Sequence, residues 1–117
     1  MTISRVLLSG STNGRPIKIV ATATPGTTIH TAQSGTSGED EIYVWVTNTD
    51  SSAHDLTCEF GGTTNPDDHI VHTYSIPPNS LPFPILTGQC LNNSLAVKMF
   101  ASAANVLVAS GFVNRIA

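Results

Sequence analysis

The chain has 117 residues and a formal net charge of −3, and only 11% of its residues are charged. This length suits one domain with a single core. The few lysines and arginines form no basic patch, which argues against a nucleic-acid binder. Because no apolar run is long enough for a membrane span or a signal peptide, we expect a cytosolic protein with neither nucleic acid nor membrane as its partner.

A surface with so few charges gives weak repulsion between molecules and favours self-association. The composition therefore fits a subunit of an assembly, and it fits equally well a solitary β-domain rich in Ser, Thr and turns. The two cysteines, Cys58 and Cys90, are interpreted as thiols in a reducing compartment, with a disulfide as the alternative.

Residues 1–14 are predicted to form an N-terminal arm, and residues 15–117 to form the folded domain. The arm contains one short apolar run, Val6 to Leu8, ahead of a segment rich in Gly, Ser, Thr and Asn. Such an arm could dock on a neighbouring subunit. The alternatives are an edge strand of the same domain or a frayed terminus.

The first strands are expected at residues 15–24 and 27–32, where β-branched residues alternate on either side of a Pro-Gly turn. An exposed loop follows at residues 33–38. Beside it, Glu39, Asp40 and Glu41 form an acidic cluster that lacks the alternating ligand spacing of a calcium loop, so we interpret it as an exposed, solvated loop end.

A β-hairpin is predicted over residues 40–62. Ile42, Val44 and Val46 alternate with Tyr43, Trp45 and Thr47, and after a polar loop Leu56, Cys58 and Phe60 point inward from a second strand. If one face of this sheet is open, the two aromatic residues on it are natural anchors of a protein interface. If both faces are covered, they belong to the core.

Further strands are expected at residues 69–76, 94–101 and 105–116, and the proline-rich stretch 77–84 is an extended connection or a sheet edge. Gly111 in the last strand indicates a bulge or a close backbone approach. No stretch has helical spacing with caps. We therefore predict an all-β, single-domain β-sandwich, jelly-roll-like or immunoglobulin-like, of about eight short strands.

Motifs for catalysis or cofactor binding are absent, so we predict no enzyme activity, no catalytic residue, no metal site and no cofactor. His69 and His72, beside two aspartates, resemble half of a metal site. Residues three apart on a strand point to opposite faces of the sheet. The His69 and His72 side chains can therefore meet only if the strand has a bulge or if His69 belongs to the preceding loop.

Nearly the whole chain resembles small virion structural proteins of tailed bacteriophages. The segments that carry the resemblance are GSTNGRPIKIVATATPGTTIHTA, DEIYVWVTNTD, TCEFGGTTNPDD, IPPNSLPFPIL and LNNSLAVKMFASAANVLVASGFVNRI. The resemblance implies a capsid decoration or cement protein on the exterior of the virion, made in the host cytoplasm. Its implied partners are the major capsid protein and further copies of itself in a homotrimer.

The surface expected to make these contacts consists of Arg5, Val6, Leu7, Leu8, Arg15, Tyr43 and Trp45. Two alternatives stay open. One is a tail or fibre component, including a carbohydrate-binding module for host attachment. The other is a small metal-dependent or cupin-like enzyme that uses His54, His69 and His72.

Overall fold

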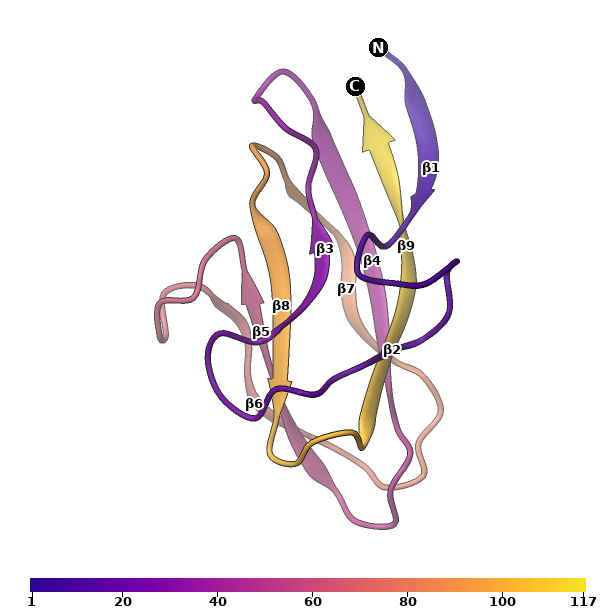
Figure 1. The fold of residues 1–117 in the computed structure, drawn as a ribbon, viewed down its shortest axis with the longest axis vertical. Coiled ribbons are helices and arrows are strands. Elements are labelled where there is room, and N and C mark those ends of the chain that lie inside the picture. Colours follow the sequence, from indigo (N-terminus) through magenta and orange to yellow (C-terminus); the bar gives the residue numbers. More distant parts are fainter.

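A computed structural model describes all 117 residues, which form strands, turns and loops without any helix. The nine strands, in chain order, are β1 (Ile3–Leu7), β2 (Ile17–Lys18), β3 (Thr27–Thr31), β4 (Glu39–Asn48), β5 (His54–Phe60), β6 (His69–Ile76), β7 (Phe83–Leu91), β8 (Ala96–Ala101) and β9 (Leu107–Ile116). Sheet A has the order β1-β9-β4-β7, with β2 also beside β9, and sheet B has the order β3-β8-β5-β6 (Figure 1). The structure offers no helix that could span a membrane.

The strands pair in a nested pattern in which each pair encloses the next. β2 pairs with β9, β3 with β8, β4 with β7 and β5 with β6, all antiparallel. One long hairpin rolled into two sheets has this pattern, which is the jelly-roll arrangement. β1 and β2 share one position next to β9, so nine strands occupy eight positions. The predicted single-domain β-sandwich is confirmed, and the pairing matches its jelly-roll alternative.

The alternation predicted for β4 places its side chains correctly. Ile42, Val44 and Val46 are fully buried between the sheets, whereas Tyr43 and Trp45 lie half-buried on the opposite face. Burial of one such aliphatic side chain stabilises a fold by roughly 1.5–3 kcal/mol. The core cluster contains Leu8, Ile17, Ile19, Ile29, Ile42, Val44, Val46, Leu56, Cys58, Ile76, Leu86, Val97, Met99, Ala101, Leu107, Ala109 and Val113.

The predicted hairpin over residues 40–62 is wrong, because its two strands belong to different sheets. β4 pairs with β7 and β9, whereas β5 pairs with β6 and β8. The connection between them crosses the end of the sandwich. The buried Asn48 holds this crossing, since its Nδ2 donates to the carbonyl oxygens of Ser52 and Ile76 and its Oδ1 accepts from Asp50 N. Alternation shows which way side chains point, but not which strand is the partner.

The N-terminal residues form an edge strand of sheet A, as one of the alternatives for this segment expects. β1 pairs with β9 from Ile3 to Leu7, and Leu8 is buried in the core. Gly10 N then donates to Ile29 O at 2.9 Å, which ties the following loop to the edge of sheet B. A contact of this segment with another subunit stays a prediction.

The strand expected over residues 15–24 is reduced to Ile17–Lys18, because the chain then leaves sheet A. Ile19 N still donates to Leu107 O, but Val20 N and Ala21 N donate to Thr27 Oγ1 where the chain turns toward β3. This segment continues over sheet B, where Ala101 N donates to Ala21 O. The crossing explains the short strand.

The C-terminal half follows the predicted ranges more closely. β6 spans residues 69–76 as expected, and the proline-rich stretch leads into β7, which lies at the edge of sheet A. Gly111 marks a close backbone approach, because a Cβ atom there would overlap the carbonyl oxygen of Tyr43 on β4.

Candidate functional site: the outer face of sheet A

Three neighbouring strands of sheet A bring an aromatic cluster together on the face that points away from sheet B. Phe112 of β9 is in register with Leu7 of β1 on one side and with Tyr43 of β4 on the other. Trp45 lies two residues further along β4, on the same face. We call Arg5, Tyr43, Trp45 and Phe112 the aromatic face.

The rings of the aromatic face are stacked on one another. Tyr43 and Phe112 have ring centroids 4.9 Å apart and nearly parallel planes, at 17°. Trp45 also stacks on Phe112, with ring centroids 6.2 Å apart and an angle of 30° between the planes. The Arg5 guanidinium carbon lies 4.6 Å from the centre of the Phe112 ring, which is within cation–π range. Phe112 is therefore the centre of the group.

Tyr43 is held by its hydroxyl group as well as by its ring. The hydroxyl donates to Glu41 Oε1 at 2.9 Å, and Asn114 Nδ2 donates to the same oxygen at 3.2 Å. The hydrogen bond to Glu41, together with burial, raises the pKa of Tyr43. Gly88 of β7 leaves room for the phenol, since a Cβ atom there would lie 3.2 Å from the Tyr43 hydroxyl oxygen.

The arrangement is suited to binding rather than to chemistry. Stacked rings lose little conformational freedom when a partner covers them, so little of the contact energy is spent on ordering. Trp, Tyr and Arg are also the residue types that dominate binding hot spots. Ile3 and Leu7 flank the group on β1 and are 61% and 55% exposed, which extends its apolar area to the edge of the sheet.

The structure gathers only part of the interface residues predicted from the sequence. Arg5, Leu7, Tyr43 and Trp45 lie on this face. Val6 points the other way and packs against the core, and Leu8 is a core residue. Since β1 is an extended strand, its successive side chains alternate between the two faces, so the run could not present one surface.

Phe112 was missed as a site residue, although the sequence contains a signal for it. Val113 is buried in the core, so its neighbour on the strand must point to the opposite face. The pairing that sets it beside Tyr43 joins residues far apart in the chain, and nothing local indicates that register.

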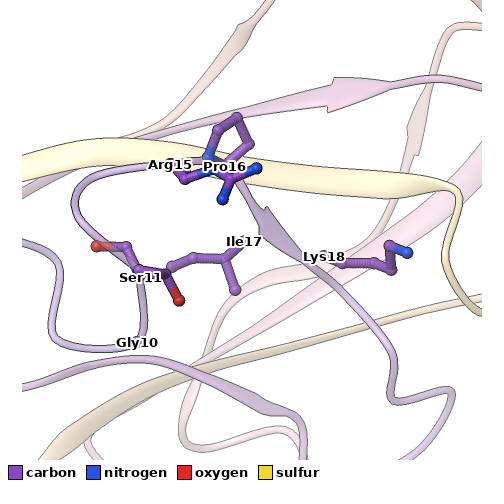
Figure 2. A pocket seen from close by; sticks show the side chains of 7 residues that line it. Gly10, Ser11, Arg15, Pro16, Ile17 and Lys18 are labelled. Atoms are coloured by element: carbon purple, nitrogen blue, oxygen red, sulfur yellow. The ribbon is translucent and has the colours of Figure 1, made fainter.

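Arg15 lies apart from the aromatic face, in a shallow concavity of about 340 Å³ beside β2 (Figure 2). Its lining residues are Gly10, Ser11, Thr12, Arg15, Pro16, Ile17 and Lys18. Figure 2 shows the Lys18 side chain extending away from Arg15. The two cations are thus not directed at one point, and Ser11 Oγ is already bonded to Leu8 O and Gly14 N.

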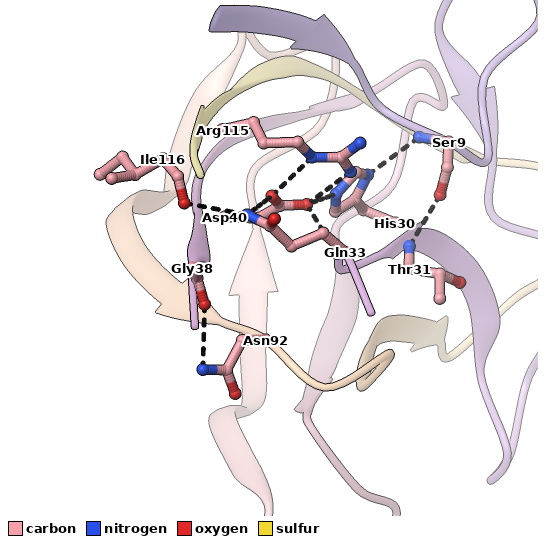
Figure 3. A network of polar contacts seen from close by, with 9 residues as sticks. All are labelled: Ser9, His30, Thr31, Gln33, Gly38, Asp40, Asn92, Arg115 and Ile116. Atoms are coloured by element: carbon pink, nitrogen blue, oxygen red, sulfur yellow. Dashed lines mark hydrogen bonds and ion pairs between the residues drawn. The ribbon is translucent and has the colours of Figure 1, made fainter. Parts of the chain in front are cut away.

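A buried polar network lies between the sheets near the chain ends (Figure 3). Asp40 is fully buried and accepts hydrogen bonds from Arg115 Nε and Nη2, both at 2.9 Å, from His30 Nε2 at 2.7 Å, and from Gln33 N and Nε2, both at 3.2 Å. Burial by itself raises the pKa of Asp40, but the hydrogen bonds from Arg115 and His30 outweigh it and hold that pKa below its usual value.

The hydrogen bonds of His30 define its tautomer. Ser9 N donates to Nδ1 at 3.0 Å, so Nδ1 carries no proton and Nε2–H donates to Asp40. Ser9 contacts the imidazole through its backbone, while its Oγ accepts from Thr31 N at 2.7 Å. The trio therefore lacks the hydroxyl-to-imidazole contact of a nucleophilic triad, and its geometry is that of a structural clamp.

His69 and His72 converge, which the sequence allowed only with a bulge or with His69 in the loop. The register between β5 and β6 shifts twice near Cys58, and Thr73 has a φ of 51°. The two Nδ1 atoms lie 2.8 Å apart, so one imidazole donates to the other. His69 Nε2 is buried without a partner, which favours the tautomer in which Nδ1–H of His69 is the donor.

With this tautomer, the Nδ1 atoms of His69 and His72 are both occupied by the hydrogen bond between the two rings. His54, the third histidine considered for a metal, is instead paired with Asp50 at 2.7 Å. The structure contains no group of three or more His, Cys, Asp or Glu side chains placed to hold an ion.

Fold and site together define a jelly-roll domain with a preformed aromatic cluster on the outer face of one sheet. Comparisons of this chain with the models of known protein families, with curated proteins and with solved structures found no match.

Proposed function

We propose that the protein is a capsid decoration protein, which binds the outer surface of a phage head through the aromatic face and stabilises the shell. Its partner in this proposal is the major capsid protein, and the protein acts as a homotrimer. The observation that carries the binding role is the stack of Tyr43, Phe112 and Trp45 with Arg5 above it. The assignment to a phage head rests on the sequence resemblance.

A decoration protein needs a surface that adheres to a lattice without unfolding or reshaping. The aromatic face supplies large contact area from strands rather than loops, so its geometry is held by the sheet. The low charge of the chain, 11% of residues, also keeps the repulsion between neighbouring copies weak. Jelly rolls occur in many capsid and lectin domains, which agrees with the proposal as an analogy of fold only.

Stabilisation of the shell then follows from mass action. A protein that binds the assembled lattice and not the separated subunits shifts the equilibrium toward assembly. Each bound copy adds to this effect, so a weak contact repeated over many sites is sufficient. No catalytic step is required.

The test uses purified phage heads that lack this protein. We expect the added protein to co-sediment with the heads, to appear on their outer surface by electron microscopy, and to raise their disruption temperature. Trp45→Ala should weaken binding by about 2 kcal/mol or more, which is a loss of roughly 30-fold. Arg5→Ala should weaken it as well, and it leaves the ring stack in place.

Tyr74→Ala is the matched control, because Tyr74 is an aromatic residue on sheet B and is 48% exposed. It should bind heads like the unaltered protein. Equal binding by the Trp45→Ala variant, with its fold verified by circular dichroism, would contradict the role of the aromatic face. Heads whose stability is unchanged by the bound protein would contradict the cement role.

A tail or fibre component that binds carbohydrate is the second candidate, and the same stacked rings favour it, since aromatic rings also pack on sugar rings. The two candidates differ in location. Labelling of the tail rather than the head, with glycan binding that is lost in Trp45→Ala, would select the second one.

A further inference from the structure

A separate pocket of about 120 Å³ lies on the outer face of sheet B, on the other side of the core from the aromatic face. Its lining residues are Thr22, Asp55, Thr57, Thr73, Phe100, Ala101 and Ser102. The cross-strand pair Thr57 and Phe100 forms its centre. Asp55 lies two residues before Thr57 on β5, and Ser102 follows the end of β8 and is bonded to the Asp55 backbone. Strands β5, β6 and β8 and the segment before β3 thus all contribute to it.

Several polar groups in this pocket have no partner within the protein. The carboxylate of Asp55 makes no hydrogen bond or ion pair, and the hydroxyl groups of Thr22 and Thr73 make none either. Thr57 Oγ1 accepts from Thr73 N, which leaves its own proton available. Ser102 Oγ accepts from Asp55 N and lies 3.4 Å from His54 Nδ1, to which its proton is directed, because His54 Nε2 donates to Asp50. The pocket therefore offers both donors and acceptors to a ligand.

The backbone at Thr73 is strained at the wall of this pocket. Its φ of 51° lies in the left-handed region, which a β-branched residue rarely adopts. Thr73 N donates to Thr57 Oγ1 at 3.2 Å, and this bond helps to hold the strained turn. Strain of this kind, maintained by its surroundings, is concentrated at binding sites.

Phe100 gives the pocket one apolar wall with a defined orientation. The His69 ring contacts it edge-on, with centroids 6.3 Å apart and an angle of 71°, and His69 is itself held by His72. An aromatic ring beside a free carboxylate and several hydroxyl groups matches the two kinds of surface on a sugar. The ring packs on the C–H face, and the carboxylate accepts from hydroxyl groups.

We infer that this pocket binds a single ring of a neutral carbohydrate. A cationic side chain would also suit Asp55 and Phe100, but it has no acceptor for the protons of the pocket hydroxyl groups, whereas a sugar hydroxyl both donates and accepts. The volume of about 120 Å³ is small for a ligand pocket, which limits the ligand to one ring or the end of a chain.

The experiment is a titration of ¹⁵N-labelled protein, separately, with glucose, galactose, mannose, rhamnose and N-acetylglucosamine, followed by NMR. We expect at least one sugar to bind with millimolar affinity and to shift the amide signals of Thr57, Thr73 and Ser102. Asp55→Asn should weaken this binding at least tenfold. Asp67→Asn, which alters an exposed acid outside the pocket, should leave it unchanged.

The inference is overturned if none of the five sugars shifts the pocket signals, or if the Asp55→Asn variant binds sugar as well as the unaltered protein does. It is also overturned if n-butylammonium shifts these signals and no sugar does. The Asp55→Asn variant should still bind phage heads through the aromatic face, so failure here is distinguishable from failure of the proposed function.

Discussion

Replacement of Asp40 by asparagine is expected to destabilise the protein strongly, although the two side chains have nearly the same shape. The carboxylate is fully buried and accepts five hydrogen bonds from Arg115, His30 and Gln33. In the variant one oxygen becomes an NH₂ group, which faces donors and cannot accept from them. The Arg115 charge, on a side chain that is two-thirds buried, loses its counter-charge.

The expected cost follows from this loss. Removal of one partner from a buried ion pair typically costs about 3–5 kcal/mol. For a domain of this size, 1 kcal/mol corresponds to roughly 3–6 °C in Tm, so the variant should melt about 9–30 °C lower. Urea unfolding monitored by Trp45 fluorescence gives the free energy of unfolding directly.

The pH dependence supplies a second test with a defined sign. The pKa of Asp40 in the folded protein lies below its ordinary value of 3.8. Its contribution to stability is therefore complete above that value and is lost as the pH falls through the folded pKa. The difference in stability between the unaltered protein and Asp40→Asn should be constant above about pH 5 and should shrink in more acid solution.

The control is Asp67→Asn, which alters an exposed acid whose side chain makes no hydrogen bond or ion pair, and its stability should be within about 0.5 kcal/mol of the unaltered protein. If Asp40 acts through Arg115, the loss from Asp40→Asn combined with Arg115→Met should be clearly smaller than the sum of the two single losses. An Asp40→Asn variant that unfolds within 1 kcal/mol of the unaltered protein, at roughly neutral pH, would refute the reasoning.

Three further predictions concern single positions. Gly111→Ala should lose several kcal/mol, on the order of 3, because the new methyl group would overlap the carbonyl oxygen of Tyr43; an unchanged Tm would contradict this. Thr73→Gly should raise the free energy of unfolding by about 0.5–1 kcal/mol in urea titrations, because glycine adopts positive φ without strain, and a decrease would count against strain at this site. A thiol reagent should modify only Cys90 in the native protein, because burial raises the pKa of Cys58 to about 12, and mass spectrometry should find both cysteines modified only after unfolding.

The class of the fold could be predicted from local patterns, because each strand shows which of its sides is apolar. The alternation from Ile42 to Thr47 gave the inward and outward faces of β4 correctly, and the range 69–76 for β6 was also correct. These features depend on neighbouring residues alone. Strand partners depend on residues far apart, and so the hairpin prediction for β4 and β5 was wrong.

The candidate site could be predicted only in part, for the same reason. Tyr43 and Trp45 were identified from the strand that carries both, but Phe112, at the centre of the stack, comes from a strand almost 70 residues away (112 − 43 = 69). The salt bridge between Asp40 and Arg115 joins two residues 75 positions apart. Asp40 was interpreted from sequence as part of an exposed acidic cluster, and only its partners explain why it is buried.

The outward residues of sheet B are another case where local patterns mislead. Thr57 and Glu59 alternate with the core residues Leu56 and Cys58, so both should face solvent, yet both are buried. The segment before β3 folds over Glu59, whose carboxylate accepts from Thr24 Oγ1 and Gly26 N, and Thr57 accepts from Thr73 N of β6. The cover comes from a loop whose path no periodicity describes.

The nested strand pairing orders the folding reaction in time. β5 and β6 are close in the chain and can pair early. β9 must pair with β1, β2 and β4, which lie far from it in the sequence, so these pairs form later. During translation, therefore, sheet A stays incomplete until β9 has left the ribosome, and the free edge of β4 is exposed to other nascent chains in that interval. High rates of synthesis should then favour aggregates, and slower synthesis at low temperature should increase the soluble yield.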